Sequence, residues 1–168
     1  ALERPENVER LVVLNTWLWS NSGNASLERA GRLLAGPVGR FLYRRLDFSP
    51  RVLLPAAFFD RSLLTPEVHR HYRGPFANPS ERQAPWVLAR ELTGSNEWYE
   101  GLWRRRELLA GKPTLLIWGM RDRLMPPAHL SRLEEALPDA RVLRLPDTGH
   151  FPQEEAPERT AEALREFL

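Results

Sequence analysis

The sequence predicts an α/β protein with a partial parallel sheet and a large helical insertion. Two apolar runs, residues 11–15 and 114–118, indicate strands buried on both faces. A third strand is expected at residues 142–145. Residues 25–105 carry several helix start and stop signals and no convincing strand. We therefore expect residues 1–18 and 106–168 to form a sheet-containing core, and residues 19–105 to form a helical cap.

The composition limits the classes of function. Of the 168 residues, 42% are hydrophobic and 27% are charged, which is typical of a globular domain. A net charge of +2 is too balanced to indicate a nucleic-acid partner. The chain has no cysteine, which excludes disulfides and thiolate metal sites. No apolar run approaches the roughly 20 residues of a membrane span. We expect a cytoplasmic protein that binds neither nucleic acid nor membrane.

Helix signals divide the insertion and the C-terminal part into short helices. Ser26, Thr65 and Asn78 are predicted N-caps, and Glu81 follows Asn78 at the spacing of a capping box. Short basic runs at residues 40–45 and 104–106 have acidic neighbours, so we interpret them as solvated helix faces. A helical insertion between two strands of a parallel sheet is typical of a lid over the carboxyl edge of that sheet.

Two residues with catalytic potential follow strands at that edge. Asp122 comes just after the second strand, and His150 follows it by 28 residues, after the third strand. This separation accommodates one crossover helix and one strand, and right-handed crossovers would bring both residues to the same edge. We predict that the carboxylate and the imidazole lie within hydrogen-bonding distance, roughly 2.6–3.2 Å.

An acid beside a histidine supplies two members of a nucleophile–His–acid triad. His150 would accept a proton, and Asp122 would orient the ring and stabilise its charged form. Structural alternatives remain for both residues: a hydrogen-bonded loop histidine, and a helix N-cap or a surface partner of Arg121 or Arg123. Asp147 competes as the acid, although a residue so close to His150 in sequence favours a turn role.

The remaining histidines are assigned no role. His69 and His71 stand two residues apart, which places them on different faces of a helix, and His129 lies on a separate predicted helix. This spacing argues against a metal site, and we expect no metal and no organic cofactor.

Two motifs resemble a known family. The pattern Trp-Gly-x-x-Asp at residues 118–122, followed by Gly-His-Phe-Pro-Gln-Glu-Glu at residues 149–155, resembles the C-terminal third of α/β-hydrolases. The stretch 11–19 and the cap-like middle resemble haloalkane dehalogenases and their close relatives. No nucleophile elbow, Gly-x-Ser-x-Gly or Gly-x-Asp-x-x-Gly, occurs in the sequence. We therefore expect the remainder of a hydrolase polypeptide, with the elbow and further strands, as the partner of this chain.

The resemblance implies a reaction. An upstream nucleophile, expected to be Asp, would displace halide from a small apolar haloalkane, and His150 would activate water against the resulting ester. In some relatives the triad acid stands at the position of Asn15, but an amide cannot serve as that acid. The resemblance and the six tryptophans also suggest substrate-pocket residues, which are Trp17, Phe58, Phe59, Trp86, Leu124 and Phe151.

Three other functions stay open. An epoxide hydrolase of the same fold would need lid tyrosines, for which Tyr43, Tyr72 and Tyr99 are available. A serine esterase would need Ser in the missing elbow. A non-catalytic fragment would lack the elbow altogether. The residue at the elbow would distinguish among these functions.

Overall fold

The computed structural model describes residues 1–168, which pack as two units. The first unit comprises residues 1–17, 56–64 and 104–168, and the second comprises residues 18–55 and 65–103. The sheet belongs to the first unit, and the second is entirely helical. The segment 56–64, which the sequence places inside the expected cap, packs with the first unit.

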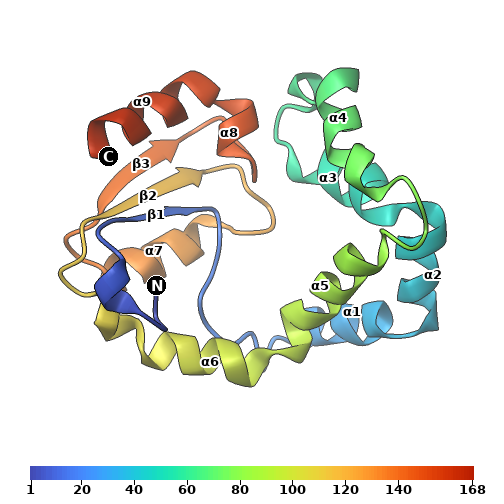
Figure 1. Cartoon of the computed structure of the whole chain (residues 1–168), viewed down its shortest axis with the longest axis horizontal. Coiled ribbons are helices and arrows are strands. Elements are labelled where there is room, and N and C mark those ends of the chain that lie inside the picture. Colours follow the sequence, from blue (N-terminus) through green and yellow to red (C-terminus); the bar gives the residue numbers. More distant parts are fainter. The chain divides into compact units, whose positions relative to one another are not determined.

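The sheet has three parallel strands, as predicted. They are β1 (Leu11–Leu14), β2 (Thr114–Gly119) and β3 (Arg141–Leu145), and β2 lies in the centre (Figure 1). Leu14 pairs with Ile117, and Gly119 pairs with Leu145. This register brings the carboxyl ends of neighbouring strands to one edge, so the loops that leave them start side by side.

Burial differs between the strands. Every residue of β2 is buried, as the apolar sequence predicted, because β2 has a strand on either side. The expectation of burial on both faces is wrong for β1, and β3 is also partly exposed. All four residues of β1 are only half-buried, and Arg141 and Arg144 of β3 are exposed. An outer strand has one free edge, so part of its surface reaches solvent.

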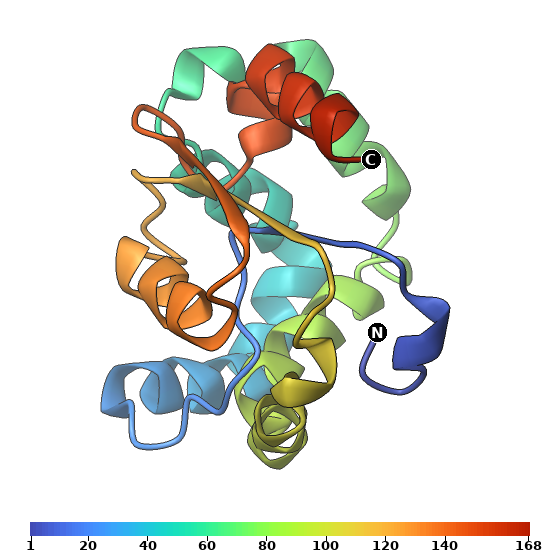
Figure 2. The ribbon, with the colours of Figure 1, turned by 90° about the vertical axis from the view of Figure 1, so that its left-hand side faces the viewer.

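Helices from the C-terminal part cover the sheet. They are α7 (Pro127–Ala136), α8 (Pro152–Glu155) and α9 (Pro157–Phe167). Figures 1 and 2 show α7 and α9 on opposite sides of the sheet. Phe167 of α9 joins Leu115, Ile117 and Leu145 in a buried apolar cluster. Leu115 and Ile117 stand two residues apart on β2, so they supply core side chains to one face of the sheet.

The insertion is helical, as predicted. Its α-helices are α1 (Ala25–Ala35), α2 (Pro37–Leu46), α3 (Leu54–Ala57), α4 (Pro66–Arg73), α5 (Gln83–Gly94) and α6 (Asn96–Arg104). Short 3-10 or π turns occupy Pro5–Asn7, Ser49–Leu53, Arg61–Leu63, Gly74–Phe76 and Arg106–Leu109. None of these helices, nor any other in the structure, is both long and apolar enough to cross a membrane.

Two of the three predicted caps differ from the structure. Thr65 caps α4 as expected, since its side chain accepts the backbone N–H of Val68. The cap of α1 is Asn24 rather than Ser26. Glu81 accepts the backbone N–H of Asn78 at 2.7 Å, as in the predicted capping box, but α5 starts only at Gln83. The backbone carbonyl of Asn78 accepts the N–H of Glu81 at 3.1 Å. That bond closes a separate turn before the helix.

A buried aspartate organises the end of α2. Asp47 has a left-handed backbone (φ 56°), which ends the helix. Its carboxylate lies 3.6 Å from Nε of Arg51, 3.1 Å from Nε of Arg73 and 3.4 Å from Nε of Arg82. One buried charge therefore ties α2 to α4 and to the segment that leads into α5. Tyr43, Trp86 and Ala89 form the apolar core beside it.

Replacing Gly119 with Ala should destabilise the intact protein. A Cβ at Gly119 would lie 1.9 Å from the carbonyl oxygen of Gly149 and 2.6 Å from that of Thr148. Both are backbone atoms of the loop that carries His150, so relief requires moving that loop. We expect a loss of about 1–3 kcal/mol in the free energy of unfolding, measured by urea denaturation.

Gly101→Ala is the matched control. A Cβ there has nothing within 4 Å, and the residue lies within α6. This substitution should stabilise the protein by about 0.5–1 kcal/mol, since Ala is the better helix former. Equal effects of the two substitutions would contradict the close packing at Gly119.

Candidate functional site

Asp122 and His150 meet at the carboxyl edge of the sheet. The predicted contact is confirmed, since Nδ1 of His150 lies 2.7 Å from Oδ2 of Asp122. Asp147 is exposed in the turn after β3, and the imidazole contacts Asp122 instead. The structure therefore brings together the two residues to which the sequence assigns the acid and base roles.

Backbone hydrogen bonds join the loops that carry this pair. The N–H of Met120 donates to the carbonyl of Leu145 at 2.9 Å, and that of Arg121 donates to Thr148 at 2.9 Å. The indole N–H of Trp118 donates to the carbonyl of Met125 at 3.0 Å, which closes the acid loop on itself. These hydrogen bonds thus fix the backbones of the two loops relative to each other.

The carboxylate of Asp122 is buried and well supplied with donors. Its Oδ2 accepts from His150 and from Nδ2 of Asn15, the latter at 2.7 Å, and its Oδ1 accepts the N–H of Leu124 at 2.7 Å. Burial by itself raises the pKa of Asp122. Hydrogen bonds from His150, the Met125 backbone and Asn15, together with the charge of His150, outweigh burial and lower this pKa below its ordinary value. Asp122 is therefore ionised at neutral pH.

The ring of His150 is oriented from several sides. Its backbone N–H donates to the carbonyl of Ala57 at 3.0 Å, and Phe151 meets the ring edge-on with centroids 5.1 Å apart. The side chain is 24% exposed, whereas that of Asp122 is fully buried. With Nδ1 bonded to the carboxylate, Nε2 is the nitrogen that could take a proton from water or a nucleophile.

Glu155 is a supporting residue that the sequence did not reveal. Its Oε1 accepts the N–H of Gly149 at 3.0 Å, while Oε2 accepts the N–H groups of Phe59 and Asp60 at 2.8 and 3.2 Å. One carboxylate therefore joins the His150 loop to the segment 57–60. It is the last residue of the Gly-His-Phe-Pro-Gln-Glu-Glu motif, but the sequence pattern assigned it no role.

Most of the predicted pocket residues share a unit with the pair. Phe58 is buried, and its ring lies 5.2 Å from that of Phe151. Phe59 is exposed, with the guanidinium of Arg121 lying 5.3 Å from its ring centre. Leu124 is exposed and Trp17 is half-buried. Phe58 and Phe151 thus form an apolar contact directly beside His150.

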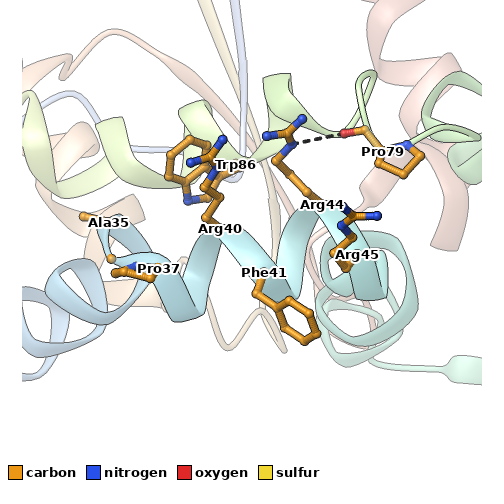
Figure 3. A pocket seen from close by; sticks show the side chains of 9 residues that line it. Ala35, Pro37, Arg40, Phe41, Arg44, Arg45, Pro79 and Trp86 are labelled. Atoms are coloured by element: carbon orange, nitrogen blue, oxygen red, sulfur yellow. Dashed lines mark hydrogen bonds between the residues drawn. The ribbon is translucent and has the colours of Figure 1, made fainter.

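Trp86 belongs to the second unit and is part of its core. Its indole N–H donates to the carbonyl of Leu34 at 2.8 Å, and the guanidiniums of Arg40 and Arg90 lie 5.9 and 5.1 Å from its ring. It also lines a cleft of about 530 Å³ along α2 (Figure 3).

The basic run 40–45 forms one side of this cleft rather than a uniformly solvated face. Arg40 lies over the Trp86 ring, and Nε of Arg44 donates to the carbonyl of Pro79 at 3.3 Å (Figure 3). These contacts tie α2 to α5 and to the turn before it, so both side chains have a packing role.

The other three histidines are not part of this pair. His69 and His71 lie on α4 in the second unit, and His129 lies on α7 in the first. Nε2 of His69 bonds the carbonyl of Pro50 at 2.7 Å, and His71 is exposed on α4. Burial lowers the pKa of His129, which favours its neutral form. No group of three or more His, Asp or Glu side chains in residues 1–168 could hold a metal ion.

The fold and the acid–histidine pair define a class of protein. A family model described as the alpha/beta hydrolase fold matches residues 1–157. The chain belongs to this family, and within it the resemblance to haloalkane dehalogenases is confirmed. Haloalkane dehalogenase 2 of Mycobacterium tuberculosis is 32% identical over 168 residues, which are 99% of this chain and 58% of that protein.

Solved structures agree. The haloalkane dehalogenase DbeA of Bradyrhizobium elkani superposes with a TM-score of 0.81 at 25% identity, over 98% of this chain and 60% of that one.

A shorter sequence similarity extends to a lipase. Lipase 1 of Psychrobacter immobilis is 34% identical over 55 residues, which are 33% of this chain and 17% of the lipase. The chain thus spans 58% of the length of the dehalogenase sequence that it matches.

The lowered pKa of Asp122 predicts a pH dependence of stability. Its ionised form is stabilised by folding, so this contribution is present above its ordinary pKa and is lost as pH falls through the folded value. In urea unfolding of the intact protein, Asp122→Asn should lose less stability than wild type between about pH 5 and pH 2. The exposed Asp139→Asn is the control and should follow wild type. A slope unchanged in Asp122→Asn would contradict the assignment.

Glu155→Gln should loosen the His150 loop. All three hydrogen bonds to Glu155 come from backbone N–H donors, and an amide must turn its own N–H₂ toward at least one of them. We expect a loss of about 1–3 kcal/mol in unfolding free energy. Faster amide hydrogen exchange at Gly149, Phe59 or Asp60 would locate the effect. Glu158→Gln, an exposed change on α9, should alter neither measurement.

Proposed function

We propose that the intact protein hydrolyses the carbon–halogen bond of small apolar haloalkanes, giving an alcohol and a halide ion. The observation that carries this proposal is the 2.7 Å contact between Asp122 and His150 at the carboxyl edge of the sheet. The similarity to haloalkane dehalogenase 2 favours this reaction over others that the same pair could serve.

In the proposed reaction, an upstream carboxylate attacks the carbon that bears the halogen. The carbon–halogen bond breaks, halide leaves with the bonding electrons, and an alkyl ester of the enzyme remains. His150 then takes a proton from water at Nε2, and the hydroxide attacks the ester carbonyl. The ester collapses to the alcohol and the free carboxylate, and the proton leaves His150 for solvent.

The chain supplies the base and its partner for the second step. Ionised Asp122 stabilises the imidazolium that forms when His150 takes the proton. Phe58 and Phe151 provide apolar surface beside the ring, which suits a substrate without polar groups. The proposed participants are haloalkane, water and halide, with no metal or organic cofactor. We assign Trp17, Phe59 and Leu124 to the substrate pocket of the intact protein as part of the same proposal.

The remainder of the hydrolase polypeptide is the proposed partner of this chain. It would contribute the nucleophile and a strand beside β1, whose outer edge pairs with no other strand in residues 1–168. An unpaired edge of a parallel sheet offers backbone N–H and C=O groups to one further strand. A strand in that place would bury more of β1, whose residues are half-buried in this chain.

Two alternative hydrolases are kept open by specific observations. The similarity to Lipase 1 of Psychrobacter immobilis keeps a serine esterase open, for which the elbow residue would be Ser. An epoxide hydrolase would need tyrosine donors, but Tyr43 is 4% exposed within the core of the second unit. The esterase is the stronger alternative.

Replacing His150 with Gln should stop the reaction after its first step. The nucleophile does not need His150 to displace halide, but water needs it to attack the ester. The variant should release about one halide per active site and then stop. Incubation of the intact variant with 1-bromobutane, followed by mass spectrometry of the protein, should reveal the added butyl group.

His71→Gln is the matched control, because that histidine is exposed on α4 and should leave turnover unchanged. If wild type releases halide from no haloalkane in a broad set and instead cleaves an aryl ester, the dehalogenase proposal is wrong and the esterase replaces it.

A further inference from the structure

Asn15 occupies a position that restricts its chemistry. It directly follows β1, is 4% exposed, and has a positive φ of 31°. Among residues other than Gly, Asn and Asp tolerate this backbone region best. The position therefore favours a short side chain with an amide or a carboxyl group, placed at the edge of the sheet where Asp122 lies.

Hydrogen bonds fix which way the amide of Asn15 points. Its Oδ1 accepts the backbone N–H of Gly119 at 2.9 Å, and its Nδ2 lies 3.4 Å from the Gly119 carbonyl. A flipped amide would set its N–H₂ against the Gly119 N–H, and its oxygen against the carboxylate. Backbone groups of β2 thus aim Nδ2 at Asp122.

Asn15 and His150 donate to the same carboxylate oxygen. Both donor nitrogens lie 2.7 Å from Oδ2 of Asp122, while Oδ1 is held by the N–H of Leu124. Rotation of the carboxylate would break all three bonds together. Because an amide is neutral, Asn15 restrains the carboxylate without competing with it for the proton.

We propose that Asn15 is a positioning residue, which holds Oδ2 of Asp122 on Nδ1 of His150 and so aims Nε2 for the water-activating step. The effect of Asn15 on the water-activating step rests on the proposed function. The positioning of the carboxylate can be observed without substrate. A carboxylate in place of the amide would put two acids at hydrogen-bonding distance, and repulsion would raise the pKa of the pair.

Two variants of the intact protein test the proposal. Asn15→Gly removes the amide and accepts the positive φ, whereas Asn15→Asp keeps the shape and exchanges the donor for an acid. The exposed Asn78→Gly is the matched control. Circular dichroism establishes that each variant is folded, and Asn15→Asp carries the test if Asn15→Gly does not fold.

The first measurement needs no substrate. A proton shared between His150 Nδ1 and a buried carboxylate gives a far-downfield ¹H resonance. This resonance should broaden or move in both Asn15 variants and stay unchanged in Asn78→Gly. An unchanged resonance in folded Asn15 variants would overturn the inference.

The second measurement separates the two chemical steps. With 1-bromobutane, the initial burst of halide should be normal in Asn15→Gly, and hydrolysis of the ester should slow by roughly 10- to 100-fold. In Asn15→Asp, the hydrolysis rate should begin to fall at a higher pH than in wild type. The added negative charge favours the protonated forms of Asp122 and His150, and of His129, which also interacts with Asp122.

The outcomes distinguish this inference from the proposed function. If wild type releases no halide while the resonance responds to Asn15, the dehalogenase proposal fails and the positioning role stands. If wild type shows a burst and turnover, and the folded Asn15 variants match it at every pH, the positioning role fails and the proposed function stands.

Discussion

A charged carboxylate buried at the edge of the sheet is the constraint around which the site is arranged. Asp122 has a fully buried side chain, and leaving it ionised there without donors would cost several kcal/mol. The donors come from separate places: Asn15 after β1, the backbone of its own loop, and His150 after β3. Only a chain that brings these three segments together can keep this charge buried.

The central strand makes that convergence possible. Since β2 pairs in parallel with β1 and β3, the residues that follow all three strands leave from one edge. Gly119 then allows the His150 loop to approach the end of β2 within van der Waals contact, and Glu155 fastens that loop to the segment 57–60. The precision of the acid–histidine contact is therefore a property of backbone packing.

The helical unit also contains a buried carboxylate, but with different partners. Asp47 is also buried, but its partners are three arginines rather than a histidine and an amide. Arginine stays protonated throughout the physiological pH range, so these side chains join helices through a permanent positive charge. A histidine as partner instead provides a group that exchanges protons near neutral pH. The partner, more than the acid, decides whether a buried aspartate stabilises structure or is suited to catalysis.

The sequence by itself determined the parallel strands, the helical insertion and the pairing of Asp122 with His150. Each depends on a local pattern: apolar runs, helix caps, and residues that directly follow strands. It did not determine the cap of α1, the start of α5, or the roles of Asn15 and Glu155. Asn24 caps α1 in place of Ser26, and α5 starts at Gln83 with no side-chain cap. Asn15 and Glu155 act on backbone groups 104 and 96 residues away, at Gly119 and Phe59. Only the tertiary structure brings those groups within reach, because no local pattern records a partner so distant along the chain.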